Sequence, residues 1–278
     1  MIEHQRRSRV RSLLVACMLA GPAAASQAFA AEPAACREIA IKFDLIKPQI
    51  TSVETNQLLF ASADNGCDEL ARRLLGDGAS LEARDRLGAM PLAHAARAGA
   101  TTLVDIFLEN GAAIDARNLV GSTALYQAAE NGRMETVDLL LRKDADPNLP
   151  GRSGVTPLAA AAYRGNDAIV ALLLAHRADP TAVDATGKTA IVYAAARGFV
   201  GIVQRLLDAG VAADARYAND LTALMWAAGY GKTDTVKALL AAGAKAGLKD
   251  DRGKTALDMA REGSHSETAR LLEGASGS

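Results

Sequence analysis

Apolar residues recur along most of the chain in a unit of 33 residues. In the stretch ENGRMETVDLLLRK, Val137, Leu140 and Leu141 are spaced by three and four positions, as on one face of a helix. Leucine pairs stand at the same place in other copies: Leu74-Leu75, Leu173-Leu174, Leu206-Leu207 and Leu239-Leu240, with Phe107-Leu108 in one copy. Alanine pairs precede them: Ala95-Ala96, Ala128-Ala129, Ala161-Ala162, Ala194-Ala195 and Ala227-Ala228. Each copy is therefore predicted to hold two helices, the first of which lies close to its neighbours.

Glycine and threonine columns mark where these helices begin and end. The first glycine column is Gly88, Gly121, Gly154, Gly187 and Gly253, with Asp220 in the remaining copy. Two residues later stand Thr123, Thr156, Thr189, Thr222 and Thr255, with Met90 as the exception. The second glycine column is Gly66, Gly99, Gly132, Gly165, Gly198 and Gly231. The early glycine opens a tight turn, the threonine caps the first helix, and the second glycine ends that helix in the left-handed conformation.

The stretches GVTPLAAAAYRG and DLTALMWAAGYG carry the Thr-Pro-Leu-x-x-Ala-Ala pattern, and the chain from Asn56 to about Ala275 resembles the ankyrin-repeat family. The histidine of that pattern is absent, and only Pro91 and Pro157 keep its proline. One such unit cannot bury its apolar faces alone, so the copies are expected to stack into an all-α solenoid. The resemblance implies protein recognition with no fixed partner.

The period divides the chain into segments. We expect a signal peptide at 1–30, an N-terminal capping helix and linker at 31–55, a degenerate first repeat at 56–84, repeats at 85–117, 118–150, 151–183, 184–216 and 217–249, a C-terminal capping repeat at 250–275 and a disordered tail at 276–278. The whole C-terminal stretch EGASGS is expected to be disordered. The capping helix is expected to end near Lys47-Pro48, with Ile39, Ile41, Phe43, Leu45 and Ile46 as its apolar set.

The first thirty residues have the pattern of a secretory signal peptide. Four arginines at positions 6, 7, 9 and 11 precede an apolar run from Leu13 to Ala20, and Ala28-Phe29-Ala30 fits the small-x-small site of a signal peptidase. We predict cleavage after Ala30 and a periplasmic or secreted protein. The run is too short to anchor in a bilayer, and no other stretch approaches a transmembrane length.

Two other export patterns overlap this segment. Leu14-Val15-Ala16-Cys17 resembles a bacterial lipoprotein site, where Cys17 would receive lipid. Only five residues separate Arg11 from Cys17, which is too few for the apolar core of such a signal. Arg6-Arg7 fits the start of a twin-arginine signal, but the arginines nearby blur that pattern.

Charge and cysteine content limit the classes of binding partner and the cellular compartments that fit this chain. The chain carries a formal charge of −1 and its first thirty residues carry +3, which leaves −4 on the mature chain. No basic stripe survives cleavage, which argues against nucleic acid as the partner. Cys36 and Cys67 remain, and an even count in an exported chain permits one disulfide. We expect them to pair between the capping helix and the first repeat; two separate buried thiols are the alternative.

No catalytic, cofactor-binding or metal site is predicted. Three Gly-Lys-Thr triplets, beginning at Gly187, Gly231 and Gly253, look like the end of a phosphate-binding loop, but each lacks the glycine five residues earlier. Lys188, Lys232 and Lys254 are therefore interpreted as residues beside turns and helix ends. The histidines of the mature chain, His94, His176 and His265, fall in different repeats. The stretch GRSGV lacks the second glycine and the strand of a serine nucleophile elbow. An enzyme would need a pocket formed by residues distant in sequence.

The exposed ends of the first helices are the predicted protein-binding face. Tyr163, Arg164, Arg197 and Tyr230 should line up there in stacked repeats, and tyrosine and arginine dominate binding hot spots. The turn tips beside them are unusually apolar and carry Leu119, Val120, Arg152, Val155, Tyr217 and Leu221. Trp226 is expected to pack between neighbouring helices. Arg164 and Arg197 imply a partner surface with carboxylates.

The leading hypothesis is a monomeric, non-catalytic binding or scaffolding protein in a bacterial periplasm, without a cofactor. A secreted effector that binds proteins of another cell would use the same fold. A ligand-binding protein or an enzyme subunit is the third possibility, and a rise in melting temperature with a small molecule would mark it.

Overall fold

The computed structural model describes residues 33–275, and these residues contain helices and turns but no strand. They form two compact units, one ending at Ala79 and the other beginning at Ser80. The predicted signal peptide, its cleavage site after Ala30, Cys17 and the tail 276–278 lie outside the described residues. The predicted all-α class is confirmed for the part of the chain that is described.

The first unit consists of three α-helices and one short 3₁₀ helix. They are α3 (Ala34–Ile46), η1 (Lys47–Gln49), α4 (Ser52–Asn65) and α5 (Asp68–Gly76). A capping box begins α4, because Thr51 accepts from the backbone N–H of Glu54 while the Glu54 carboxylate accepts from that of Thr51. Helix α3 packs on α4 and ends where η1 begins, next to the predicted Lys47-Pro48 stop.

The apolar set predicted for α3 was partly wrong. Its buried residues are Cys36, Ala40 and Phe43, which are spaced by four and three and so share one helix face. Ile41 and Leu45 fall off this face and are 57% and 77% exposed.

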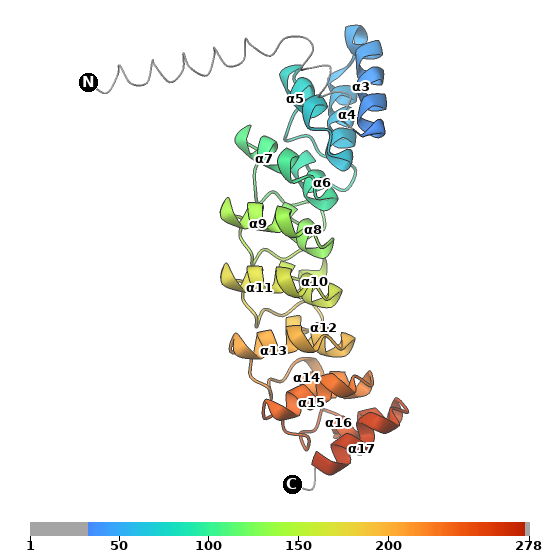
Figure 1. Cartoon of the computed structure of the whole chain (residues 1–278), viewed down its shortest axis with the longest axis vertical. Helices are drawn as coiled ribbons and strands as arrows, with labels where there is room; N and C mark the ends of the chain where they lie inside the picture. Colours follow the sequence, from blue (N-terminus) through green and yellow to red (C-terminus); the bar gives the residue numbers. More distant parts are fainter. Residues whose placement is uncertain (1–32, 276–278) are drawn as a thin grey trace, which may run out of the picture. The chain divides into compact units, whose positions relative to one another are not determined.

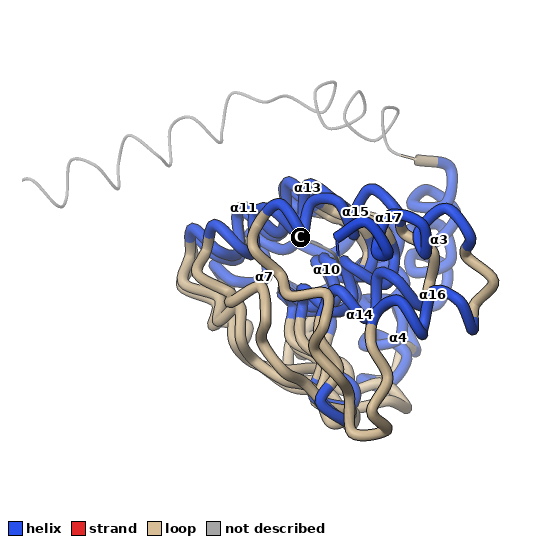
Figure 2. The backbone as a smooth tube through the Cα atoms, turned by 90° about the horizontal axis from the view of Figure 1, so that it is seen from below, coloured by secondary structure: helices blue, strands red, loops and turns tan. Residues whose placement is uncertain are grey.

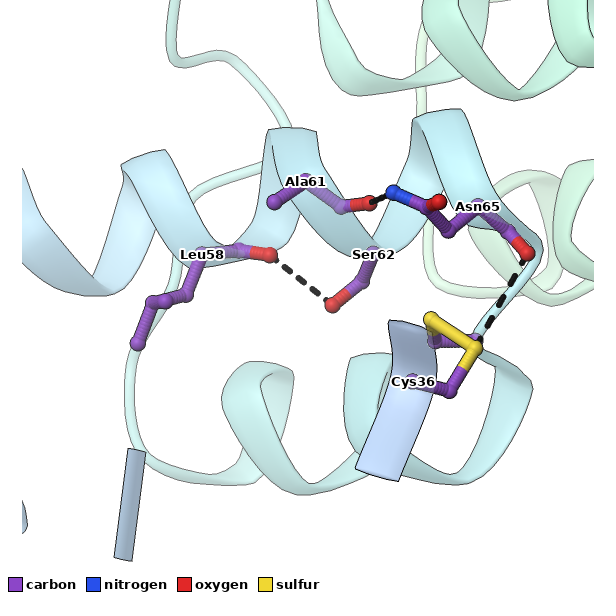
Figure 3. Close-up of a disulfide and its surroundings, with 6 residues drawn as sticks. Cys36, Leu58, Ala61, Ser62 and Asn65 are labelled. Atoms are coloured by element: carbon purple, nitrogen blue, oxygen red, sulfur yellow. Dashed lines mark hydrogen bonds between the residues drawn. A yellow bond between two sulfur atoms is a disulfide. The ribbon is translucent and has the colours of Figure 1, made fainter. Parts of the chain in front are cut away.

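Cys36 and Cys67 form a disulfide within the first unit (Figure 3). It joins the first turn of α3 to the residue that caps α5, and the two Cα atoms are 5.3 Å apart. Both cysteines are fully buried. The Cys36 Sγ lies 3.8 Å from the carbonyl oxygen of Asn65 at the end of α4, so the bridge sits where the three helices meet.

The second unit is a stack of helix pairs, coloured from green to red along the chain in Figure 1. The first helices are α6 (Pro91–Ala98), α8 (Ala124–Glu130), α10 (Pro157–Arg164), α12 (Ala190–Arg197), α14 (Ala223–Gly229) and α16 (Ala256–Glu262). The second helices are α7 (Thr101–Glu109), α9 (Met134–Arg142), α11 (Asp167–Ala175), α13 (Val200–Asp208), α15 (Thr233–Ala241) and α17 (Ser266–Ala275). First helices pack on first helices and second on second, which gives the two helical layers visible end-on in Figure 2.

Threonine caps begin most of the first helices, as the sequence predicts. Thr123, Thr156, Thr222 and Thr255 each accept from the backbone N–H three residues ahead. Thr189 makes no such bond.

The last helix, α17, continues to Ala275. The expected disorder of EGASGS is therefore wrong for its first three residues.

The second glycine column has a packing role besides its left-handed backbone. Its members in this unit have φ between 63° and 85°. A Cβ on each would press on a side chain of the next repeat. It would overlap the rings of Phe199 at Gly165 and His265 at Gly231, and would lie 2.8 to 3.2 Å from the more flexible Arg133 at Gly99, Lys232 at Gly198 and Asn166 at Gly132. The left-handed backbone favours glycine at all five positions, and at Gly165 and Gly231 the packed ring of the next repeat excludes a Cβ as well.

The turns that precede the first helix of each repeat, here called fingers, are of two kinds. In four fingers the side chain of Asp85, Asn118, Asp184 or Asp250 accepts from two backbone N–H groups of its own turn. The other two fingers, at the start of repeats 151–183 and 217–249, have Gly151 and Tyr217 in place of this side chain. There the chain forms short 3₁₀ turns, η2 (Arg152–Gly154) and η3 (Ala218–Asp220), with Ser153 and Asn219 left-handed.

Arg177 stands in a left-handed position just past α11, with φ 66°. Equivalent copies have Gly111, Gly210 or Gly243, and one has Asp144 with φ 65°. We predict that Arg177→Gly is neutral or stabilises the protein by up to about 1 kcal/mol, because glycine removes the strain but gains entropy in the unfolded chain. Urea denaturation would measure the change. Asp144→Gly is the control and should gain less, since aspartate tolerates this conformation better; a clear loss at Arg177 would contradict the strain.

Candidate functional site

Three of the four predicted helix-end residues line one groove in the second unit. Tyr163 at the end of α10, Arg197 at the end of α12 and Tyr230 just after α14 surround a hollow of about 600 Å³. Two further residues, Tyr193 and Trp226, come from the middle of α12 and α14. We call this hollow the aromatic groove; its lining is Tyr163, Lys188, Val192, Tyr193, Ala196, Arg197, Phe199, Trp226, Tyr230 and Lys232.

Trp226 has a role in the groove that the sequence did not predict. Its indole is only half-buried, stacks on Tyr230 with ring centres 6.0 Å apart, and faces the groove. Tyr193 stands in the equivalent place one repeat earlier and meets Tyr163 edge to face at 5.7 Å. A sequence signal for both existed, because Tyr193 and Trp226 are four residues before Arg197 and Tyr230 and so share their helix face.

Cations cover the aromatic rings. The Lys188 Nζ lies 5.3 Å from the centre of the Trp226 ring, and the Arg197 guanidinium lies 4.9 Å from that of Tyr163. Lys188 and Lys232, which belong to two of the Gly-Lys-Thr triplets, both line the groove. Their surroundings are aromatic rings and helix ends rather than a glycine-rich loop, so the structure gives them a place in a groove that the sequence did not predict.

A hydrogen bond to Asp184 fixes the position of the Tyr193 ring. The buried carboxylate accepts hydrogen bonds from the hydroxyls of Tyr193 and Thr186 and from the backbone N–H groups of Thr186 and Lys188. Burial raises the pKa of Asp184, but these hydrogen bonds outweigh burial and hold the pKa below its usual range. The ionised Asp184 carboxylate therefore stabilises the folded protein above its unfolded pKa of about 4. This contribution to folding is lost as the pH falls through the pKa that Asp184 has in the folded protein.

Arg164, Val155 and Leu221 line hollows next to the aromatic groove. Arg164 and Val155 share theirs with Tyr163 and Tyr193, and the Arg164 guanidinium is 3.6 Å from the carboxylate of Glu130. Leu221 shares another hollow with Trp226 and Tyr230. Because Tyr163, Tyr193, Trp226 and Tyr230 each belong to two of these hollows, the three follow one another across the first helices.

The other predicted turn residues do not line these hollows. Leu119 and Val120 are 79% and 45% exposed at the tip of their finger, where the Leu119 N–H donates to the carbonyl of Leu87. Arg152 is exposed on η2. Tyr217 is half-buried before η3, and burial raises the pKa of its phenol. The helix-end residues and two of the predicted tip residues, Val155 and Leu221, therefore line the groove or its neighbouring hollows, and the remaining tip residues lie at the fingers.

Among residues 33–275 no group of three or more histidine, cysteine, aspartate or glutamate side chains could hold a metal ion. His94 bonds to Asp85 at 3.0 Å, and His265 lies 3.1 Å from the carbonyl oxygen of Gly229. No helix in this part of the chain is both long and apolar enough to cross a bilayer.

Comparison with known families agrees with this architecture. A family model described as ankyrin repeats (3 copies) matches three overlapping stretches, residues 58–151, 146–217 and 191–277. The chain belongs to the ankyrin-repeat family. Ankyrin repeats generally mediate protein–protein interactions and are typically non-catalytic scaffolds. A search of curated proteins found no match.

Proposed function

We propose that this ankyrin-repeat protein is a non-catalytic scaffold, exported to the periplasm of a bacterium, that binds a protein partner through the aromatic groove. One observation carries the proposal. Five aromatic side chains and three cations converge on a single hollow, whereas only 4% of the chain is aromatic. Partly exposed tyrosine, tryptophan and arginine side chains of this kind dominate the energy of protein interfaces.

We predict that Tyr163→Ala and Arg197→Ala each weaken partner binding by more than about 1 kcal/mol without loss of the fold. Tyr163 is 42% exposed and supports the Arg197 guanidinium, so either truncation removes contact area from the groove while leaving the helix core intact. The partner would be captured from a periplasmic extract with the mature protein as bait. Titration calorimetry would then compare the variants, and circular dichroism would check their folding.

Arg142→Ala is the matched control. Arg142 is an exposed arginine on the second-helix layer, where it pairs with Asp138 at 2.8 Å. Normal binding by Arg142→Ala together with weakened binding by the groove variants supports the proposal. The reverse result would place the binding surface on the opposite layer. A partner found only in culture supernatant would favour the effector, and a melting temperature raised by a small molecule would favour a ligand-binding protein.

Export is supported by the arginine-rich start, the Ala28-Phe29-Ala30 pattern and the Cys36–Cys67 disulfide, which suits an oxidising compartment. We predict that the mature protein begins at Ala31 and is recovered from the periplasmic fraction. Intact-mass spectrometry of the purified protein would measure its first residue. A retained Met1 or a lipid on Cys17 would contradict the prediction.

A further inference from the structure

The lining of the aromatic groove carries three positive charges, on Lys188, Arg197 and Lys232, and no carboxylate. None of the three forms an ion pair within the described residues. Arg197 and Lys232 also line an adjoining hollow that contains Asp234 and Glu267, whereas Lys188 does not. Elsewhere in the same unit about half of the lysines and arginines are paired with a carboxylate, as Arg205 is with Asp167 at 2.7 Å. A cation-lined groove on a chain of net negative charge is suited to an anionic ligand.

The aromatic rings hold two of these cations in place. A cation above a ring face is attracted to it but keeps its charge and its N–H donors for another partner. Lys188 over Trp226 and Arg197 over Tyr163 are thus positioned before a ligand arrives, which lowers the entropy cost of binding. The same cations repel a positively charged ligand.

The three cations branch from the backbone near the two ends of α12. Lys188 precedes the cap of α12, whereas Arg197 is the last residue of α12 and Lys232 caps α15 beyond Gly198. Helix α12 has 8 residues, so at about 1.5 Å per residue its two ends are roughly 12 Å apart. Tyr193 lies between these ends on α12, and the Lys188 Nζ extends to 5.3 Å from the centre of the Trp226 ring on α14.

We propose that the groove binds an extended acidic segment of the partner protein, with two carboxylates four residues apart and an aromatic or large apolar side chain midway between them. In an extended chain four residues span about 13 Å, and alternate side chains point the same way. All three side chains would therefore face the groove, the carboxylates toward the two cationic ends and the middle one toward the rings. The inference rests on the proposed function and specifies the chemistry of its partner.

Synthetic peptides test this pattern with Trp226, the only tryptophan of the chain, as the fluorescent reporter. The probe has glutamate at its second and sixth positions, phenylalanine at its fourth and serine at its remaining three. We expect saturable quenching or a spectral shift of Trp226. Binding should weaken at least tenfold when both glutamates become glutamine, and also when the glutamates are moved to adjacent positions. It should weaken several-fold between low salt and 0.5 M salt.

Protein variants locate the binding. Lys188→Ala and Lys232→Ala should each weaken peptide binding at least fivefold, whereas Lys245→Ala should leave it unchanged, because Lys245 is exposed after α15 and pairs with Asp214. Equal binding of the glutamine peptide would overturn the proposal, as would tighter binding of oligothymidylate or an unchanged affinity in both groove variants. If a captured protein depends on Tyr163 and Arg197 but no acidic peptide binds, the acidic segment is wrong and the proposed function stands.

Discussion

Replacing both Cys36 and Cys67 by alanine is expected to lower the free energy of unfolding of the first unit by about 3–4 kcal/mol in the chain-entropy model. The bridge closes a loop with a sequence separation of 31. Its loss therefore raises the conformational entropy of this loop in the unfolded state. Alanine leaves little empty volume at the two fully buried sites, which keeps a packing loss small beside the entropic one. The helices that the bridge joins should open first.

Hydrogen–deuterium exchange is the measurement that separates this unit from the rest. In the double variant the amides of α3, α4 and α5 should exchange faster by a factor of a hundred or more, while those of α10 to α14 keep their protection. Dithiothreitol should reproduce the effect in the natural protein and add nothing in the variant. Two free thiols titrated in oxidised, denatured protein would contradict the disulfide.

The sequence predicted the repeat architecture well because its signals are local and recur. A threonine that caps a helix or a glycine that ends one acts within a few residues, and six copies average out exceptions such as Met90 and Asp220. The apolar set of α3 had no copies to average. Ile41 and Leu45 were included for their hydrophobicity alone, although their spacing from Phe43 puts them off its face.

The groove was only half predictable. Tyr163, Arg197 and Tyr230 were predicted because equivalent positions align in stacked repeats. Trp226 was assigned to helix packing because an aromatic residue at helical spacing usually belongs to the core, and Tyr193 was not singled out. Lys188 and Lys232 reach the groove from a finger and from the start of a second helix. Lys188 and Lys232 do not occupy equivalent positions of the repeat. Whether both line the same groove therefore depends on how α12 and α14 pack.

Gly165→Ala is expected to cost about 2–4 kcal/mol, because it combines backbone strain with a steric clash. Gly165 has φ 82°, and a Cβ there would lie 2.6 Å from the ring of Phe199. Gly165→Ala should therefore both destabilise the protein and displace the Phe199 ring. Phe199 also lines the aromatic groove beside Arg197, whose guanidinium is 5.9 Å from its centre. The substitution should therefore disturb the groove from a position outside its lining.

Gly111→Ala separates the two causes. Gly111 has φ 88° but no atom within 4 Å of an added Cβ, so alanine should cost only the backbone strain of about 1–2 kcal/mol. Urea denaturation gives the two losses, and Trp226 fluorescence reports on the groove of each folded variant. We expect a changed spectrum for Gly165→Ala alone. Equal losses and identical spectra would mean that Phe199 moves aside freely, and the glycine column would then serve the backbone without serving the contact between repeats.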